Sequence, residues 1–381
     1  MKVVIVGGSS AGLYAALLLK RKHPDFEVLV IDKNEQVGRK LCATGNGHCN
    51  LLREQIDPKD FRHPSSVERL LRKYPIDQLK EILFSFGVTL KNIDGLYYPN
   101  SFSAPAHVRH LQGLCERLGV EFRLKEKVLS YGKNEVKTNH GAIVCDKIIF
   151  ASGGKSQDNL GSDGSLFAEF AGHGYAVKTP IPGLCPVKVK EDVRCLKGLR
   201  HDAKVTVTSK GRPLFKEDGE VLFKQDGLSG IVVFNASRYL ANEGGAKIII
   251  DLFPDLSYDN LRATLCKLND LDAGHFADGL LVPPLAEYLR KRLKQEGKAW
   301  NPAELAQICK HLEFTYKGLY PFDSSQVTVG GISLDDVNED FSSVREPNVF
   351  FIGEVLDNDG PCGGYNLTWC LWTALAVAEA L

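Results

Sequence analysis

The sequence predicts an α/β protein whose nucleotide-binding domain is split by an insertion. The chain begins with an apolar strand, a glycine turn and a helix in the segment 3–20, and it ends in the same style, with a strand at 349–352 and an apolar helix at 365–381. Between these ends, residues 186–251 alternate with the short period of antiparallel strands, and residues 257–312 read as several helices. We therefore expect the two ends to form one domain and the middle to form an insertion.

The first element is a strand–turn–helix that suits a dinucleotide. Val3–Val6 is a run of apolar β-branched residues, as in a parallel strand that is buried on both faces. The strand ends at Gly7-Gly8, and a helix is expected over Ala11–Lys20. Such a turn points backbone N–H groups and a helix N-terminus at one place, which suits a pyrophosphate. The usual glycine pattern is broken by Ser9, whose small side chain still permits close approach of a phosphate.

The next strands carry polar and small residues at their ends. Val28–Ile31 runs into Asp32, about 25 residues after Gly7. A carboxylate at that place can accept hydrogen bonds from the ribose hydroxyls of an adenosine. Helices are expected within 60–90 and over 105–119. A further apolar strand at 147–150 then leads into four small residues, where the backbone can pass close to a bound dinucleotide.

The C-terminal segment carries a second signal. Its strand ends in Gly353-Glu354, which puts a carboxylate where the hydroxyls of a ribityl chain could be held. A turn at Gly363-Gly364 then opens the last helix, whose N-terminal N–H groups carry partial positive charge. Reduced flavin is anionic, so such a helix end would stabilise it. A plain NAD domain needs neither feature, and the two ends together therefore favour FAD.

Composition narrows the class of protein. The 381 residues suffice for two or three domains, and 47 Lys and Arg balance 47 Asp and Glu. No overall charge therefore favours nucleic acid or an anionic membrane. No apolar stretch reaches the roughly 18–20 residues of a membrane span, and the first strand leaves no room for a signal peptide. We expect a cytoplasmic protein with no nucleic-acid or membrane partner, and its oligomeric state stays open.

The ten cysteines are scattered and show no metal-ligand spacing. We expect no metal site, and no disulfide framework in a chain of this size. Cys42 and Cys49 flank a glycine-rich loop, but their spacing is wider than that of flavoprotein disulfide reductases, and a structural role is expected. Cys362 lies in a loop expected at the active site and is the better candidate for a reactive thiol.

Five motifs together resemble one flavoprotein family. In chain order they are GRKLCATGNGHCN (38–50), FASGGKSQDNLGSDG (150–164), FKQDGLSG (223–230), VTVGGIS (327–333) and IGEVLDNDGPCGGYNL (352–367). The series is similar to that of the BaiN-like family, also called the aminoacetone-oxidase family of FAD-binding enzymes, and it covers essentially the whole chain. The resemblance implies a Rossmann-like FAD-binding domain in 1–185 and 325–381, a β domain in 186–255 and a small helical domain in 256–324.

The resemblance also implies a set of cofactor contacts. The residues that would contact the ADP half are Ser9, Ser10, Asp32 and Lys33, and the main chain of Val128 would contact the adenine. The residues that would line the approach to the pyrophosphate and the flavin are Arg39, Lys40, Asn46 and Asn50. The ribityl and isoalloxazine end would be held by Glu354, Gly364, Tyr365, Asn366 and Leu367. The glycine turns add Gly7, Gly12, Ala151 and Gly153. The family commonly has Arg where this chain has His48, and Thr where it has Ser152. His48 is also a candidate proton donor.

The expected activity is that of an FAD-dependent oxidoreductase acting on a small organic substrate. No second strand–GxGxxG–helix motif occurs in 186–330, so the flavin is reduced either by transiently bound NAD(P)H or by the substrate itself. The resemblance suggests reduction of a carbon–carbon double bond next to a carbonyl, or amine oxidation. Candidate lid residues are Tyr97, Tyr98, His201 and Tyr365, and the sequence assigns none of them a catalytic role.

Three alternatives differ in their observable properties. A flavin-binding redox sensor or partner-binding protein would hold FAD tightly without significant turnover. An NAD(P)-dependent dehydrogenase that uses Asp32 for the ribose would be colourless. A flavin-dependent RNA-modifying enzyme would need a basic surface that the balanced charge does not indicate.

Overall fold

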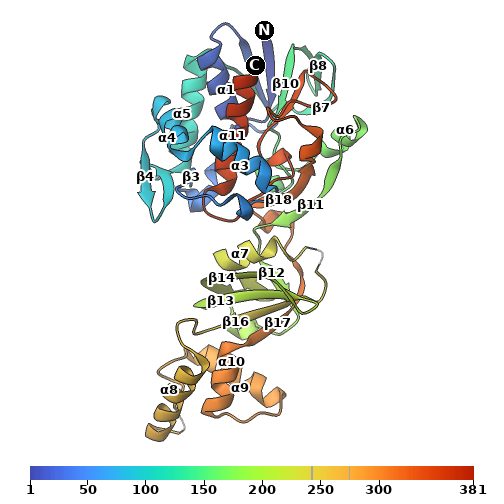
Figure 1. Ribbon diagram of the computed structural model, residues 1–381. Helices are drawn as coiled ribbons and strands as arrows, with labels where there is room; N and C mark the ends of the chain where they lie inside the picture. The colour runs from blue at the N-terminus through green and yellow to red at the C-terminus, as the bar shows by residue number, and fades with distance from the viewer. Residues whose placement is uncertain (242, 274) are drawn as a thin grey trace. The chain divides into compact units, whose positions relative to one another are not determined.

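The computed structural model describes residues 1–241, 243–273 and 275–381, which form two compact units (Figure 1). Unit 1 contains Met1–Ile181 and Gln326–Leu381, and unit 2 contains Pro182–Ser325. Each unit has its own cluster of buried apolar side chains. The further division of the insertion near residue 255 into a β domain and a helical domain stays a prediction.

Unit 1 is built on a five-stranded parallel sheet in the order β19-β10-β1-β2-β6. Its strands are β1 (Lys2–Val6), β2 (Glu27–Asp32), β6 (Glu121–Leu124), β10 (Lys147–Phe150) and β19 (Val349–Phe351). The last strand of the chain therefore joins a sheet that the first strand begins. The predicted α/β fold, with a Rossmann-like domain split in sequence, is confirmed.

The helices of unit 1 follow the predicted pattern, with one difference inside 60–90. They are α1 (Ser10–Lys22), α2 (Arg39–Cys42), α3 (Pro64–Lys73), α4 (Ile76–Ser85), α5 (Ala104–Arg117), α6 (Phe167–Gly172) and α11 (Tyr365–Ala380). The stretch 60–90 contains two helices because Pro75 interrupts it, and Gly87 turns the chain into a strand. Short 3-10 helices lie at Thr44–Gly47, Pro58–Asp60, Asp158–Leu160, Leu334–Asp336 and Gly353–Val355.

Helix α11 is apolar on nearly every side because it is enclosed by the rest of unit 1. It packs against α1, and its Trp369 and Trp372 are fully buried. Each indole N–H has an acceptor: Trp369 donates to the Gly353 carbonyl at 3.1 Å, and Trp372 to the Tyr74 carbonyl at 2.9 Å. Buried indoles need such partners. The first of these bonds ties α11 to the turn that carries Glu354.

Two small antiparallel sheets complete the body of unit 1. One contains β3 (Leu52–Arg53), β4 (Leu90–Ile93) and β5 (Leu96–Pro99), and the other β7 (Val128–Gly132), β8 (Glu135–Thr138) and β9 (Gly141–Val144). A separate pair, β11 (Val177–Gly183) with β18 (Val327–Ile332), stands where the chain leaves unit 1 and where it returns. Gly330 allows the pairing, because a Cβ there would lie only 2.6 Å from the Thr179 carbonyl oxygen.

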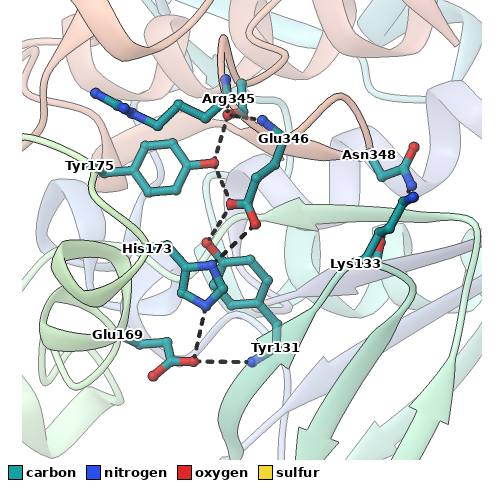
Figure 2. Close-up of polar contacts among 9 residues, drawn as sticks. Tyr131, Lys133, Glu169, His173, Tyr175, Arg345, Glu346 and Asn348 are labelled. Atoms are coloured by element: carbon teal, nitrogen blue, oxygen red, sulfur yellow. Dashed lines mark hydrogen bonds and ion pairs between the residues drawn. The ribbon is translucent and has the colours of Figure 1, made fainter.

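A polar network joins β7 and α6 to the C-terminal part of unit 1 (Figure 2). The Glu346 carboxylate accepts from the hydroxyls of Tyr131 at 3.0 Å and Tyr175 at 2.7 Å, and faces His173 Nδ1 at 3.1 Å. The other ring nitrogen of His173 lies 3.5 Å from the Glu169 carboxylate, and the ring stacks on Tyr131. Both ring nitrogens thus face carboxylates, and burial raises the pKa of both phenols.

Unit 2 is a closed antiparallel barrel with four α-helices among its described residues. The barrel order is β12-β15-β14-β13-β16-β17, with β12 (Val187–Val189), β13 (Arg200–Ser209), β14 (Arg212–Phe223), β15 (Gly227–Ser229), β16 (Lys247–Asp251) and β17 (Leu312–Leu319). The helices are α7 (Ile231–Ser237), α8 (Tyr258–Leu271), α9 (Pro283–Gln295) and α10 (Pro302–Lys310), with 3-10 turns at Arg194–Leu196 and Phe322–Ser324. The antiparallel strands are as expected, whereas the closing strand β17 is not among the predicted strands.

No helix in the described parts of the chain is both long enough and apolar enough to cross a bilayer.

Candidate functional site

The first glycine turn leaves room for a ligand backbone at the start of α1. A Cβ at Gly7 would overlap the Ala151 carbonyl oxygen, and a Cβ at Gly12 would overlap the Gly7 carbonyl oxygen. Gly7 also has a φ of +109°, a region that side chains rarely adopt. The turn is therefore pressed between β10 and α1, and only glycine fits. Ser9 is the N-cap of α1, and its side chain makes no capping bond, so the helix start remains open toward a phosphate.

Asp32 fastens this turn to the end of β2. One carboxylate oxygen accepts from Gly8 N at 2.9 Å, and the other accepts from the backbone and side-chain amides of Asn34 at 2.8 and 2.9 Å. Arg39 donates to the Asn34 side chain at 3.1 Å. Lys33 forms an ion pair with Asp163 at 2.6 Å. The structure thus brings the predicted residues 32, 33 and 39 together, and adds two that the sequence pattern does not indicate.

The second glycine turn, after β10, packs on β18. A Cβ at Gly154 would overlap the side chain of Thr328, and Gly153 has a φ of +72°. The hydroxyl of Ser162 lies beside Gly153; it is buried and has no hydrogen-bond partner within the described ranges. A buried hydroxyl without a partner is costly unless a ligand completes it. Ser162 is therefore a further candidate contact.

Glu354 occupies the centre of the site. Both of its carboxylate oxygens face Lys40 Nζ, at 2.9 and 2.6 Å, and one also accepts from Thr328 N at 2.8 Å. The side chains of Lys40 and Glu354 are 16% and 21% exposed, so the ion pair is largely shielded from water but a ligand can still contact it. The carboxylate is consequently held in place from two sides, by α2 and by β18.

The loop 44–50 leads to the N-terminus of α11. Asn46 and Cys49 have positive φ, which bends the loop sharply. With its amide oriented to match its neighbours, Asn50 donates to the Leu52 carbonyl at 3.0 Å and accepts from Gly364 N at 3.2 Å. Asn366 exchanges bonds with the backbone of Gly360. These contacts join the loop to the helix start, while the predicted contacts Val128 and Leu367 belong to β7 and α11.

The aromatic candidates are mostly engaged in structural contacts. Tyr365 donates to Asp60 at 2.7 Å, and burial together with that bond raises the pKa of its phenol. Tyr97 donates to Glu54 at 3.3 Å. His201 belongs to unit 2, where Nε2 faces a backbone carbonyl. The fourth lid candidate, Tyr98, packs edge-on against the ring of Phe102.

One of the two ring nitrogens of His48 is engaged in a contact with the backbone. His48 stacks on Phe102, and its Nδ1 lies 3.0 Å from the Phe102 carbonyl, which fixes that nitrogen as the donor. Nε2 of His48 has no hydrogen-bond partner among the described residues.

Burial raises the pKa of the Cys49 thiol to about 12 and also raises the pKa of the Cys42 thiol, which fits the structural role expected for both. Cys362 lies 3.7 Å from the Gln326 side chain.

Residues 1–380 match the family model described as "HI0933-like protein Rossmann domain". The chain belongs to this family. It is 30% identical to a 3-dehydro-bile acid delta(4,6)-reductase of Clostridium scindens, over 100% of this chain and 98% of that protein. It is 27% identical to a ribosomal RNA dihydrouridine synthase of Escherichia coli, over 99% of this chain and 97% of that protein.

Solved structures support the fold of this HI0933-like protein. A 3-ketosteroid delta1-dehydrogenase from Sterolibacterium denitrificans aligns with a TM-score of 0.51 at 12% identity, over 99% of this chain and 98% of that one. At such identity the likeness concerns the fold alone. Family membership confirms the predicted flavoprotein resemblance and the class of the protein, an FAD-dependent oxidoreductase.

The geometry of the HI0933-like site fits FAD. Glycine turns that a Cβ would fill stand at the start of α1 and after β10, and a fixed carboxylate lies between the second turn and α11. The predicted contact residues stay predictions individually. Asn34, Ser162, Asp163 and Thr328 are not among the contact residues predicted from the sequence. Ser162, Asp163 and Thr328 lie within the quoted motifs, but their contacts with residues 153, 33 and 354 arise only in the folded chain. No cluster of three metal-ligating side chains occurs in the described parts of the chain.

Proposed function

We propose that this protein reduces a carbon–carbon double bond next to a carbonyl group in a small organic molecule, using FAD that is reduced by transiently bound NAD(P)H. The carrying observation is the preset carboxylate of Glu354, held by Lys40 and Thr328 on the turn that packs against α11. If the α1 turn binds the pyrophosphate of FAD, this carboxylate would hold the ribityl hydroxyls and the N-terminal N–H groups of α11 would stabilise the reduced flavin. No second strand–GxGxxG–helix motif occurs in 186–330, so NAD(P)H would bind without a domain of its own.

The names of two full-length relatives support the reaction class. One reduces a 3-dehydro-bile acid, and the other makes dihydrouridine in ribosomal RNA. A 3-dehydro steroid with a double bond at carbon 4, and a uridine ring, share one group: a carbon–carbon double bond conjugated with a carbonyl. A small substrate is favoured over RNA because Lys and Arg only balance Asp and Glu in this chain. That both relatives are named as enzymes does not favour a redox sensor.

The residues of the chain would divide the work as follows. The α1 turn would bind the pyrophosphate, and Asp32 would orient the adenosine end. Glu354 would hold the ribityl hydroxyls, and the N-terminal N–H groups of α11 would stabilise negative charge. FAD, when bound, supplies the hydride chemistry. A proton must also reach the substrate, and His48 could hold it at Nε2, because Nδ1 is engaged with the Phe102 carbonyl.

The test is an anaerobic reduction followed by a substrate comparison. The flavin band of the purified protein should bleach promptly with NADPH or NADH. The reduced protein should then be reoxidised by a 4-ene-3-oxo steroid or a simple cyclic enone, with a product that has gained two hydrogens. Persistence of the band with both nucleotides, combined with bleaching by an amine, would replace the proposal with an amine oxidase. Reoxidation by a uridine-containing RNA but by no enone would move the substrate class to RNA.

His48 is tested in the same assay. His48→Gln should slow reoxidation by the enone more than it slows bleaching by NAD(P)H, because only the first step needs the proton. An equal effect on both steps, or no effect, would remove His48 from the proton path.

A further inference from the structure

Thr328 is a buried strand residue with four polar contacts. It is 2% exposed and lies on β18. Its backbone N–H donates to Glu354 at 2.8 Å. Its hydroxyl oxygen accepts from Lys155 N at 2.7 Å and Ser156 N at 3.0 Å, and it lies 3.1 Å from the Ser156 hydroxyl. One residue thus contacts both the carboxylate and the second glycine turn.

The packing of the turn makes this contact specific. Gly154 lies directly on Thr328, since a Cβ at position 154 would overlap both the Thr328 hydroxyl and its Cβ. That Cβ would also lie 3.1 Å from the Glu354 carboxylate. The turn, the hydroxyl and the carboxylate therefore form one closely packed group.

The other side of the Glu354 carboxylate is held by charge. Lys40 Nζ lies within 2.9 Å of both oxygens. The charge of Lys40 attracts the Glu354 carboxylate, and the backbone N–H of Thr328 orients it, because an N–H on a paired strand has a fixed direction. The carboxylate is thereby oriented before any ligand binds, and a ligand would not have to pay the entropy of ordering it.

We propose, on the basis of the FAD site proposed above and independently of the substrate, that Thr328 is a positioning residue for the flavin half of the cofactor. Its hydroxyl positions the second glycine turn and its amide positions Glu354, so one residue fixes both parts of the site that would hold the flavin half. The ADP half binds elsewhere, at the α1 turn and Asp32. Loss of the Thr328 hydroxyl should therefore weaken FAD and leave ADP unaffected.

The experiment compares two ligands and two variants of the full chain after removal of bound flavin. Thr328→Val keeps the branched shape and removes the acceptor, while Thr328→Ser keeps the acceptor. Loss of an acceptor for buried N–H groups should raise the Kd for FAD about tenfold in Thr328→Val. Thr328→Ser should stay within about twofold of wild type. The Kd for ADP should be the same in all three proteins, and thermal unfolding without ligand reports on folding.

Two results would overturn the inference. An unchanged Kd for FAD in Thr328→Val would show that the hydroxyl does not set the site. An equal weakening of FAD and ADP, accompanied by a lower unfolding temperature, would show a structural role alone. Failure of the wild-type chain to bind FAD is a distinct outcome, because it would refute the cofactor assignment itself and the inference with it.

Discussion

The buried pair of Tyr14 and His107 should make unit 1 sensitive to acid. His107 is 3% exposed, and its Nε2 lies 3.0 Å from the Tyr14 hydroxyl, between α1 and α5. Burial, and then the nearby His110, lower the pKa of His107 from 6.5 to about 4. The unfolded chain therefore binds a proton on this residue that the folded chain excludes between these two values.

The sign and size of the effect follow from this difference. A lowered histidine pKa means that stability is fully present above pH 6.5 and is lost as the pH falls toward 4. The full difference corresponds to about 3 kcal/mol, and the part lost between pH 7 and pH 5 is about 2 kcal/mol. Other groups also contribute to acid sensitivity, so the histidine must be isolated by a variant.

Urea unfolding at pH 7 and pH 5 measures the effect, with tryptophan fluorescence from Trp369 and Trp372 reporting largely on unit 1. His107→Gln removes the titrating group. The free energy of unfolding of this variant should fall by about 2 kcal/mol less than that of wild type between the two pH values. His140→Gln, at an exposed position, serves as the control and should behave as wild type. The same pH dependence in wild type and His107→Gln would refute the reasoning.

Three further predictions concern the cofactor site and the network of Figure 2. Gly12→Ala should abolish flavin binding, because its Cβ would overlap the Gly7 carbonyl oxygen; a normal ratio of flavin to protein absorbance would contradict this. Lys40→Met should weaken FAD at least about tenfold by leaving Glu354 unpaired, whereas Lys40→Arg should weaken it less in the same titration. Glu346→Gln should cost about 2 kcal/mol and lower the melting temperature by roughly 4–8 °C; an unchanged calorimetric melting temperature would show that the network adds no stability.

Local sequence patterns predict much of the fold and part of the candidate site. Gly7, Gly12 and the acidic end of β2 are readable because the turn, the helix start and the strand are contiguous in sequence. The position of Glu354 is readable for the same reason. Thr328 is not, because its role arises from contacts with residues 154–156 and 354, which only the folded sheet brings together.

The barrel shows a different limit of sequence patterns. In β17, Leu312, Phe314 and Tyr316 are buried and alternate with more exposed residues, so the two-residue period is present. The strand begins two residues after α10 ends, and the helical pattern before it hides the change of period. Closure also requires β12 to pair with both β15 and β17, which no local pattern can indicate.

The pairing of β11 with β18 has an architectural consequence. The points where the chain leaves unit 1 and returns to it lie on neighbouring strands, so unit 2 is an insertion between two adjacent strands. Because the two units also have separate buried cores, deleting the inserted unit should leave the core of unit 1 intact. A shortened chain, in which a tight turn replaces residues 182–325, would keep every strand of the parallel sheet and both glycine turns. The same junction would accept a foreign module, so the cofactor-binding body could be retained while the inserted module is exchanged.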